Sequence, residues 1–197
     1  IMNHNLRYFR PVVSLDGAHL RSKYKGALYI ASVKTPLDEI YPIAFGITKQ
    51  NEDYRGWKFF LENLKRGCPS LKDIRVRLSY NNFSLISDRD KGLKQTLKDL
   101  FPKNHVKNCA IHIARNVQVK YGQKASKWVN EIGKTHSTPY EEELFTKLER
   151  VSGQASAYLH DIEAKEWRST EWVRDPNLPP RFGITSTNIS ESVNSMF

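Results

Sequence analysis

The segment from Leu85 to Leu93, Leu-Ile-Ser-Asp-Arg-Asp-Lys-Gly-Leu, constrains the fold more than any other part of the chain. Apolar and β-favouring residues precede Asp88, whereas the leucines that follow it recur at helical spacing. The pattern predicts a strand and then a helix, with Asp88 between them. In open α/β sheets, ligands and metals are usually held at the carboxyl ends of strands. The alternative is that Ser87, Asp88 or Asp90 only caps the helix.

Three apolar, β-favouring runs come earlier in the chain. The first ends at Asp16-Gly17, a dipeptide that would ordinarily indicate a hairpin turn. The second and third runs cover 27–33 and 41–47, and the turn residues at 35–38 separate them. We expect these three runs to form an antiparallel meander.

Helical periodicity dominates the remaining segments. Within 53–66, the apolar residues Trp57, Phe60, Leu61 and Leu64 share one helical face, so we expect Trp57 and Phe60 in the core and not stacked on bases. The other expected elements are a strand over 105–109 and helices from 110, over 141–151, over 152–167 and from 187.

The charge of the chain is large and unevenly distributed. The 197 residues carry a net charge of +10, with a sequence pI near 9.6. Between Pro139 and Pro176, nine acidic residues outnumber five basic ones, so this segment is −4 and the rest is +14. A basic body favours a polyanionic partner, most simply nucleic acid. The alternative is that the charge serves only solubility.

The cysteine content and the hydropathy limit the cellular compartments in which the chain is expected. Two cysteines, Cys68 and Cys109, do not make a disulfide framework, which indicates a reducing compartment. No apolar run approaches membrane-spanning length, and there is no signal-peptide pattern. Because the chain opens with Ile1-Met2, we expect it to be an excised fragment of a longer protein.

Five strings occur in a characteristic order along nearly the whole chain. They are Asp16–Gly26, Trp57–Leu64, Ile86–Leu93, Cys109–His112 and Thr187–Asn194. Their order and rough spacing resemble those of Mutator-like (MULE) transposase domains. The order of the expected elements also has the layout of the ribonuclease H-like α/β fold, in which acidic residues from separate strands meet.

The resemblance implies a five-stranded mixed sheet and an all-helical insertion before the last helix. On this division, residues 10–135 form the ribonuclease H-like core that carries the first two carboxylates. Residues 136–180 form the helical insertion, and residues 181–197 begin the final core helix with the third carboxylate.

By this resemblance, Asp16, Asp88 and Glu191 form the DDE catalytic set, spaced by 72 and 103 positions. They would hold two Mg²⁺ or Mn²⁺ ions, because phosphodiester transfer uses paired hard cations and such ions prefer carboxylate oxygens. Glu191 could instead be a first-turn acid favoured by the helix dipole. In that case Glu166 or Glu171 would be the third member.

The string Cys109-Ala-Ile-His112 resembles an accessory motif of this and related transposase families. Its role would be to shape the site or to contact DNA near the scissile phosphate. A zinc site would need four ligands, completed by Cys68, His105 or His136 at irregular spacing. The simplest alternative is a packed cysteine and a surface histidine.

Basic side chains follow both aspartates. They could contact DNA phosphates, or they could form solvated faces. They are Arg21, Lys23 and Lys25 after Asp16, and Arg89, Lys91 and Lys94 around Asp88.

The resemblance therefore implies the catalytic core of a Mutator-like DNA transposase, an enzyme that hydrolyses element-end DNA and transfers the freed strand to target DNA. It implies double-stranded DNA as the partner and a nuclear location, and the hydropathy predicts no membrane partner. The oligomeric state is left open, with a homo-oligomer of the full-length protein as one option. Two alternatives stay open. One is a domesticated descendant that binds DNA as a regulator without cutting it, and the other is an unrelated metal-dependent nuclease of the same fold.

Overall fold

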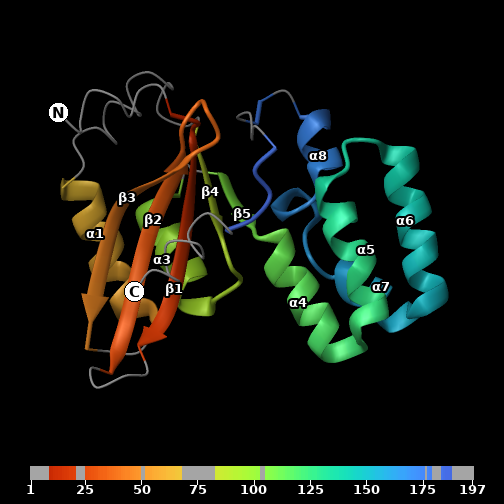
Figure 1. The fold of residues 1–197 in the computed structure, drawn as a ribbon, viewed down its shortest axis with the longest axis horizontal. Helices are drawn as coiled ribbons and strands as arrows, with labels where there is room; N and C mark the ends of the chain where they lie inside the picture. The colour runs from red at the N-terminus through yellow and green to blue at the C-terminus, as the bar shows by residue number, and fades with distance from the viewer. Residues whose placement is uncertain are drawn as a thin grey trace. The chain divides into compact units, whose positions relative to one another are not determined.

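A computed structural model describes residues 9–20, 25–49, 52–67, 83–102, 105–175, 177–178 and 183–187. Figure 1 shows a twisted sheet and, as a separate unit, a group of helices. The strands are β1 (Val12–Leu20), β2 (Gly26–Lys34), β3 (Ile40–Thr48), β4 (Ser84–Ser87) and β5 (His105–Asn108), in the order β3-β2-β1-β4-β5. β2 is antiparallel to both β1 and β3, whereas β1 is parallel to β4. The expected α/β class with a five-stranded mixed sheet is confirmed.

The first strand does not end at Asp16-Gly17. Its antiparallel pairing with β2 runs through Asp16↔Ile30 and Gly17↔Tyr29 as far as Leu20↔Gly26. The expected hairpin turn at this dipeptide is therefore wrong, and Asp16 lies inside the strand and not at its end. The physical reason is that Gly17 keeps extended backbone geometry, without the positive φ that a tight Asp-Gly turn requires.

Two helices cover one face of the sheet, α1 (Tyr54–Gly67) and α3 (Lys91–Leu100), as Figure 1 shows. All four apolar residues of the predicted α1 face are buried, and Trp57 is fully so. The Trp57 ring packs edge-on against Tyr29 of β2, with centroids 4.7 Å apart. The apolar residues of α3 meet the same core, which also includes Val13 and Leu15 of β1. The prediction that Trp57 and Phe60 belong to the core is confirmed.

A second compact unit is helical and comprises the described residues of 107–178 and 183–186. Its helices are α4 (Ala110–Tyr121), α5 (Gln123–Lys134), α6 (Thr138–Val151), α7 (Gly153–His160), the 3₁₀ helix η3 (Ala164–Glu166) and α8 (Ser169–Arg174). The buried residues of this unit form an apolar cluster of their own. Gly122, with a φ of 89°, separates α4 from α5. A left-handed φ of this kind favours glycine.

The helix predicted over 152–167 is shorter than expected. α7 ends at His160, where the amide of Ile162 turns back to the carbonyl of Leu159, and η3 follows after Glu163. This interruption lets both Ile162 and Trp167 enter the apolar cluster, and Trp167 is fully buried there. Packing of these two side chains therefore overrides continuation of the helix.

A buried polar network connects the helices of this unit. The carboxylate of Glu141 accepts a 2.7 Å hydrogen bond from the Thr170 hydroxyl, and it lies 3.9 Å from the Arg168 guanidinium. The hydroxyl of Ser169 donates to the carbonyl of Gly133 at 2.7 Å. Burial lowers the pKa of Arg168, whereas the negative charge of Glu141 opposes this effect. The network joins α5, α6 and α8 through charge and hydrogen bonding as well as apolar contact.

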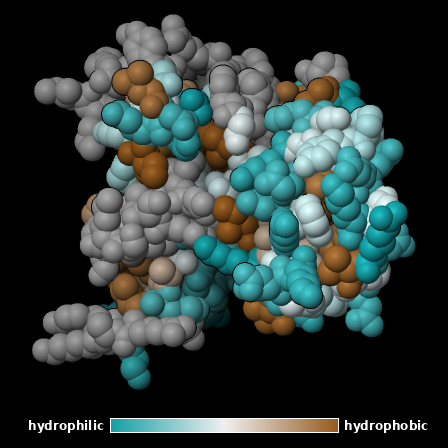
Figure 2. Space-filling model, turned by 45° about the vertical axis from the view of Figure 1, so that its right-hand side comes forward, coloured by the Kyte–Doolittle hydropathy of each residue, from teal (hydrophilic) through white to brown (hydrophobic). Residues whose placement is uncertain are grey.

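The surface of the described residues is mixed. In Figure 2, hydrophilic side chains surround small, separate apolar patches on the face in view. Some apolar side chains are well exposed, among them Phe45 and Ile47 of β3. Within the described ranges, no helix combines the length and the apolar character needed to cross a membrane.

Candidate functional site

The register of two parallel strands brings Asp16 and Asp88 together. Ser14 of β1 is the partner of Ile86 of β4, and each residue stands two positions before an aspartate. Continuing this register places Asp16 beside Asp88, at the edge where β4 ends. Neighbouring strands lie about 4.8 Å apart, so the two carboxylates occupy adjacent positions. The core residues of β1 are Val13 and Leu15, and side chains alternate along a strand, so Asp16 lies on the other face.

The two aspartates differ in exposure, and neither is the helix cap. Asp16 is only 6% exposed, whereas Asp88 is half-buried. The N-cap of α3 is Asp90, whose Oδ1 accepts a 2.9 Å hydrogen bond from the amide of Leu93. Asp88 instead accepts a 3.0 Å hydrogen bond from the amide of Asp90, which fixes the loop after β4. The capping alternative therefore applies to Asp90 and not to Asp88.

Glu52 is a third acidic residue in this region, and the sequence analysis missed it. The pKa of the Glu52 carboxyl is raised to about 7, mainly by burial and further by the negative charges of Asp88, Asp90 and Asp16, in that order. Trp57 opposes the shift, since its indole N–H favours the ionised carboxylate. Glu52 therefore lies within the electrostatic field of both predicted catalytic aspartates.

Two glycines explain how Glu52 reaches this position. A Cβ on Gly17 would collide with the carboxylate of Glu52, so the missing side chain leaves room for that carboxylate against β1. A Cβ on Gly92 would come within 2.5 Å of the amide nitrogen of Tyr54, so the start of α3 packs closely on the start of α1. The available sequence signal was a glycine directly after Asp16 in a strand that does not turn there.

The third catalytic carboxylate was predicted as Glu191, with Glu166 and Glu171 as the alternatives. Glu191 lies outside the described residues. Glu166 accepts a 2.9 Å hydrogen bond from the Asn108 side chain, and Glu171 forms an ion pair with Arg174 at 2.5 Å. Both alternatives to Glu191 thus take part in contacts of the helical unit.

The structure describes only some of the basic residues that were predicted to contact DNA. Arg89, Lys91 and Lys94 are exposed around Asp88, in the loop and on the first turn of α3. Arg21 and Lys23 lie outside the described residues. The exposure of the first three is compatible with phosphate contacts, which stay a prediction.

The Cys109 and His112 pair lies at the start of α4, in the helical unit. Cys109 is fully buried and His112 is partly buried. For a zinc site, Cys68 and the side chain of His105 are outside the described residues, and His136 is exposed. Across the described part of the chain, no three His, Cys, Asp or Glu side chains are grouped closely enough to hold a metal ion. The accessory role of the pair stays a prediction.

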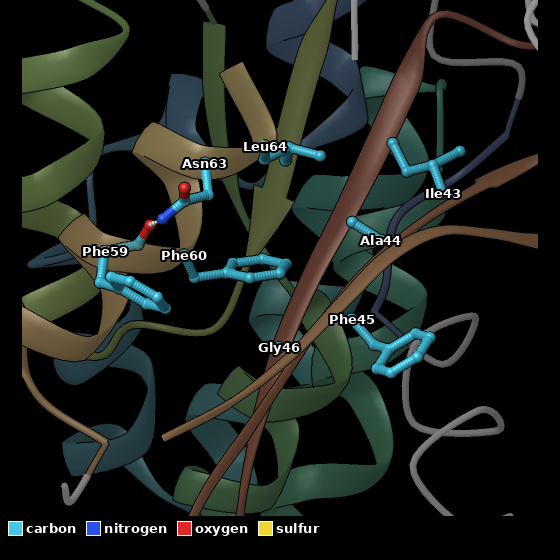
Figure 3. A pocket seen from close by; sticks show the side chains of 8 residues that line it. All are labelled: Ile43, Ala44, Phe45, Gly46, Phe59, Phe60, Asn63 and Leu64. Carbon is cyan, nitrogen blue, oxygen red and sulfur yellow. Dashed lines mark hydrogen bonds between the residues drawn. The ribbon is translucent and has the colours of Figure 1, made fainter. Parts of the chain in front are cut away.

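An apolar hollow of about 290 Å³ lies between β3 and α1. Figure 3 shows its lining, in which Phe60 points toward the strand near Gly46 while Phe45 points away. The residues around the hollow include no ionisable side chain. The carboxylate region, and not this hollow, therefore carries the candidate chemistry.

The chain matches the model of a known protein family. The family model described as the MULE transposase domain matches residues 12–116. The matched range is more than half of the chain, and it includes Asp16, Glu52, Asp88, Cys109 and His112. The curated proteins contain no match to the chain.

Proposed function

The chain belongs to the MULE transposase family, and from this premise we propose that it is the catalytic core of a DDE-type DNA transposase. Its reaction would be hydrolysis of a phosphodiester at the end of a DNA element, followed by transfer of the freed 3′ strand to target DNA. The observation that carries the proposal is the parallel register that sets Asp16 beside Asp88.

The sheet topology supports a ribonuclease H-like core for this function. An antiparallel meander of β1, β2 and β3 continues into a parallel pair formed by β1 and β4, in the order β3-β2-β1-β4-β5. The parallel pair requires a crossover, which the chain makes through α1. Such a crossover brings two strand segments that are distant in sequence to one edge of the sheet.

Asp16 and Asp88 supply carboxylate oxygens, which are the ligands that a hard divalent cation prefers. The pKa of Glu52 is raised mainly by burial, and then by the negative charges of Asp88, Asp90 and Asp16. Hard cations such as Mg²⁺ and Mn²⁺ prefer oxygen ligands and relieve this kind of repulsion. Asp16 and Asp88 would hold such ions, and Glu191 is our proposal for the third ligand. When bound, two ions activate the attacking oxygen and neutralise the charge of the leaving oxygen.

The protein's own side chains would position the catalytic carboxylates and the DNA. β1 holds Asp16 within the sheet, and the hydrogen bond from the Asp90 amide orients the carboxylate of Asp88 directly after β4, so both groups are oriented before DNA binds. The exposed Arg89, Lys91 and Lys94 would bind phosphates of the DNA backbone beside the carboxylates. Such contacts fix the position of the duplex without reading its sequence.

The test is a DNA cleavage and joining assay. Supercoiled plasmid DNA is incubated with the protein and Mn²⁺, and nicking is compared among wild type, Asp16→Asn and Asp88→Asn. Joining is measured with a labelled duplex that carries a free 3′-hydroxyl. A matched control is Asp99→Asn, the same change at an exposed position on α3.

The proposal predicts nicking and joining by wild type and by the control, with loss of both in the two site variants. Nicking without joining would identify a nuclease of the same fold. DNA binding without either reaction would identify a domesticated, non-cutting descendant.

A further inference from the structure

Backbone pairing places Phe45 of β3 in one cross-strand row with Asp16. Asp16 of β1 is the partner of Ile30 of β2, and Ile30 is in turn the partner of Phe45. Residues that stand directly opposite each other in a sheet point to the same face. Neighbouring strands lie about 4.8 Å apart, so Phe45 stands about 10 Å from Asp16 on the same face of the sheet.

The helices that cover the other face of the sheet do not account for this side chain. Gly46 faces α1, since a Cβ on it would come within 2.9 Å of the Phe60 ring. Side chains alternate along a strand, so the residues on either side of Gly46 point away from α1. Figure 3 shows this direction for Phe45. The core between α1 and the sheet therefore gives no reason for Phe45 and Ile47 to be apolar.

Phe45 and Ile47 are largely exposed, at 65% and 62%. Single exposed apolar residues are common. These two, however, are neighbours on one face of β3, the edge strand of the sheet that the described residues form, and natural edge strands usually carry charges there. Lys49 follows at the next position of the same alternation, and it is exposed too. The outer face of β3, which we define as Phe45, Ile47 and Lys49, thus combines an aromatic ring, a branched apolar side chain and a cation.

The composition of this face fits a single strand of nucleic acid. Aromatic side chains on exposed sheets stack unpaired bases, and basic side chains beside them hold phosphates. A base within a paired duplex is already stacked on both sides by its neighbours, so a base that reaches Phe45 has to be unpaired. The positive charge of Lys49 complements a phosphate backbone, whereas it would be a poor match for a wholly apolar partner.

The edge of β3 is not suited to a second protein strand. Pro42 lies in this strand, and proline has no N–H to donate to a neighbouring strand. Proline on an edge strand is one of the features that prevent pairing with another chain. A second copy of this chain added along β3 is therefore disfavoured, and nucleic acid is the partner that both the face and the edge of β3 favour.

The separation of Phe45 from Asp16 indicates which base is held. Successive bases of one stacked strand rise by about 3.4 Å, so a distance of about 10 Å corresponds to about three nucleotides. A base on Phe45 thus belongs to the strand segment next to a phosphate at Asp16.

From this arrangement we infer that the outer face of β3 is a subsite for an unpaired DNA base close to the reacting phosphate. The base stacks on the Phe45 ring, Ile47 packs against its sugar, and Lys49 binds the adjoining phosphate. The inference rests on the proposed function, because Asp16 marks where the reacting phosphate lies. In this role Phe45 is a positioning residue that holds the strand, and the chemistry stays with the carboxylates.

The test compares the binding of two labelled DNA probes by fluorescence anisotropy in EDTA, which prevents metal-dependent cleavage. One probe is a blunt duplex of about 20 base pairs, and the other is the same duplex with a 3′ overhang of about four nucleotides. Loss of stacking on one ring costs about 5- to 150-fold in affinity, so Phe45→Ala should weaken overhang binding by such a factor and blunt-duplex binding by less than about twofold. Phe45→Tyr keeps a ring and should bind as wild type does. Phe45→Leu keeps only apolar bulk and should resemble Phe45→Ala.

Two further readouts locate the base and the phosphate. An iodouracil base in the overhang forms a photochemical cross-link to an aromatic ring on which it stacks, and peptide mapping should find this cross-link at Phe45. Lys49→Gln should lower the slope of log affinity against log salt concentration by about 1, because one phosphate contact is lost.

Phe59→Ala is the matched control. Phe59 is a phenylalanine of similar exposure, 57%, but it lies on α1, on the other side of the sheet. This variant should bind both probes as wild type does, and circular dichroism should show that all variants are folded.

The outcomes separate this inference from the proposed function. If Asp88→Asn abolishes nicking while Phe45→Ala binds the overhang as tightly as wild type, the inference is wrong and the proposed function stands. If Phe45→Ala weakens overhang binding but wild type neither nicks nor joins DNA, the strand-binding face stands and the proposed catalysis is wrong. Full binding by Phe45→Leu would contradict stacking. A wild-type dimer that Phe45→Ala dissociates in analytical ultracentrifugation would show that a second copy covers this face, and would overturn the inference.

Discussion

Ser14 of β1 and Ile86 of β4 are partners in a parallel ladder, and each stands two residues before an acidic residue of the candidate site. Asp16 lies within β1, and Asp88 follows directly on β4, where its carboxylate accepts a hydrogen bond from the amide of Asp90. A site on paired strands is positioned before its ligand arrives, which favours reactions that depend on geometry.

The first prediction concerns catalysis by this pair. Asp16→Asn and Asp88→Asn should each lower DNA nicking by at least about 10³-fold, since residues that act as a unit lose most activity together. The double variant should be about as inactive as either single one. Rates of plasmid nicking in Mn²⁺ measure this. A double variant whose loss is the product of two modest single losses would show that the aspartates act independently.

The second prediction concerns the pH dependence of stability in the absence of divalent cations. The pKa of Glu52 is about 7 in the folded chain, against an ordinary value of 4.5, because of burial and of the facing Asp88, Asp90 and Asp16 carboxylates. Below pH 4.5 the group is protonated in both states. As the pH rises further, the unfolded chain releases a proton that the folded chain retains, so stability is lost up to and through pH 7.

The measurement is urea unfolding in EDTA at several pH values, for wild type beside Glu52→Gln. Between pH 5 and 8, wild type should lose on the order of 1–2 kcal/mol of unfolding free energy relative to the variant. This is less than the whole pKa shift would give, because the carboxyl is partly exposed and solvent screens its charge. A constant difference between the two proteins at all pH values would contradict the assigned pKa.

The third prediction separates Asp90 from Asp88. Asp90→Ala removes the side chain that accepts from the amide of Leu93, so it should cost about 1 kcal/mol of unfolding free energy. Asp90→Ser keeps an acceptor and should restore most of that loss. Urea unfolding followed by circular dichroism measures both. Equal stability of the alanine and serine variants would contradict the capping role.

The fourth prediction concerns the polar network of the helical unit. Glu141→Ala leaves the Arg168 guanidinium and the Thr170 hydroxyl buried without their partner, and should cost about 3 kcal/mol. The neighbouring Glu142 is exposed, so Glu142→Ala should change stability by less than about 0.5 kcal/mol. Chemical unfolding of the two variants checks this contrast. A similar small effect for both would mean that water satisfies the network.

Much of the fold could be predicted from the sequence because its signals are local. The apolar run before Asp88 and the leucines after it correspond to β4 and α3, and the spacing of Trp57 and Phe60 corresponds to the buried face of α1. Alternation and helical periodicity depend on neighbours within a few residues, so they can be read along the chain. The match to the MULE family confirms the resemblance that the ordered strings indicated.

By itself, then, the sequence determined the types of most of its elements and the family of the chain, and it singled out Asp16 and Asp88, whose catalytic role stays a prediction. Only the tertiary structure decided that β1 continues through Asp16, that Asp90 is the cap, and that Glu52 fills the space over Gly17. The same Asp-Gly pair fits a turn or a strand, and cross-strand pairing with β2 selects the strand. Glu52 lies 35 positions from Gly17 in sequence, and their contact exists only because the β1-β2-β3 meander returns the chain to that edge of the sheet.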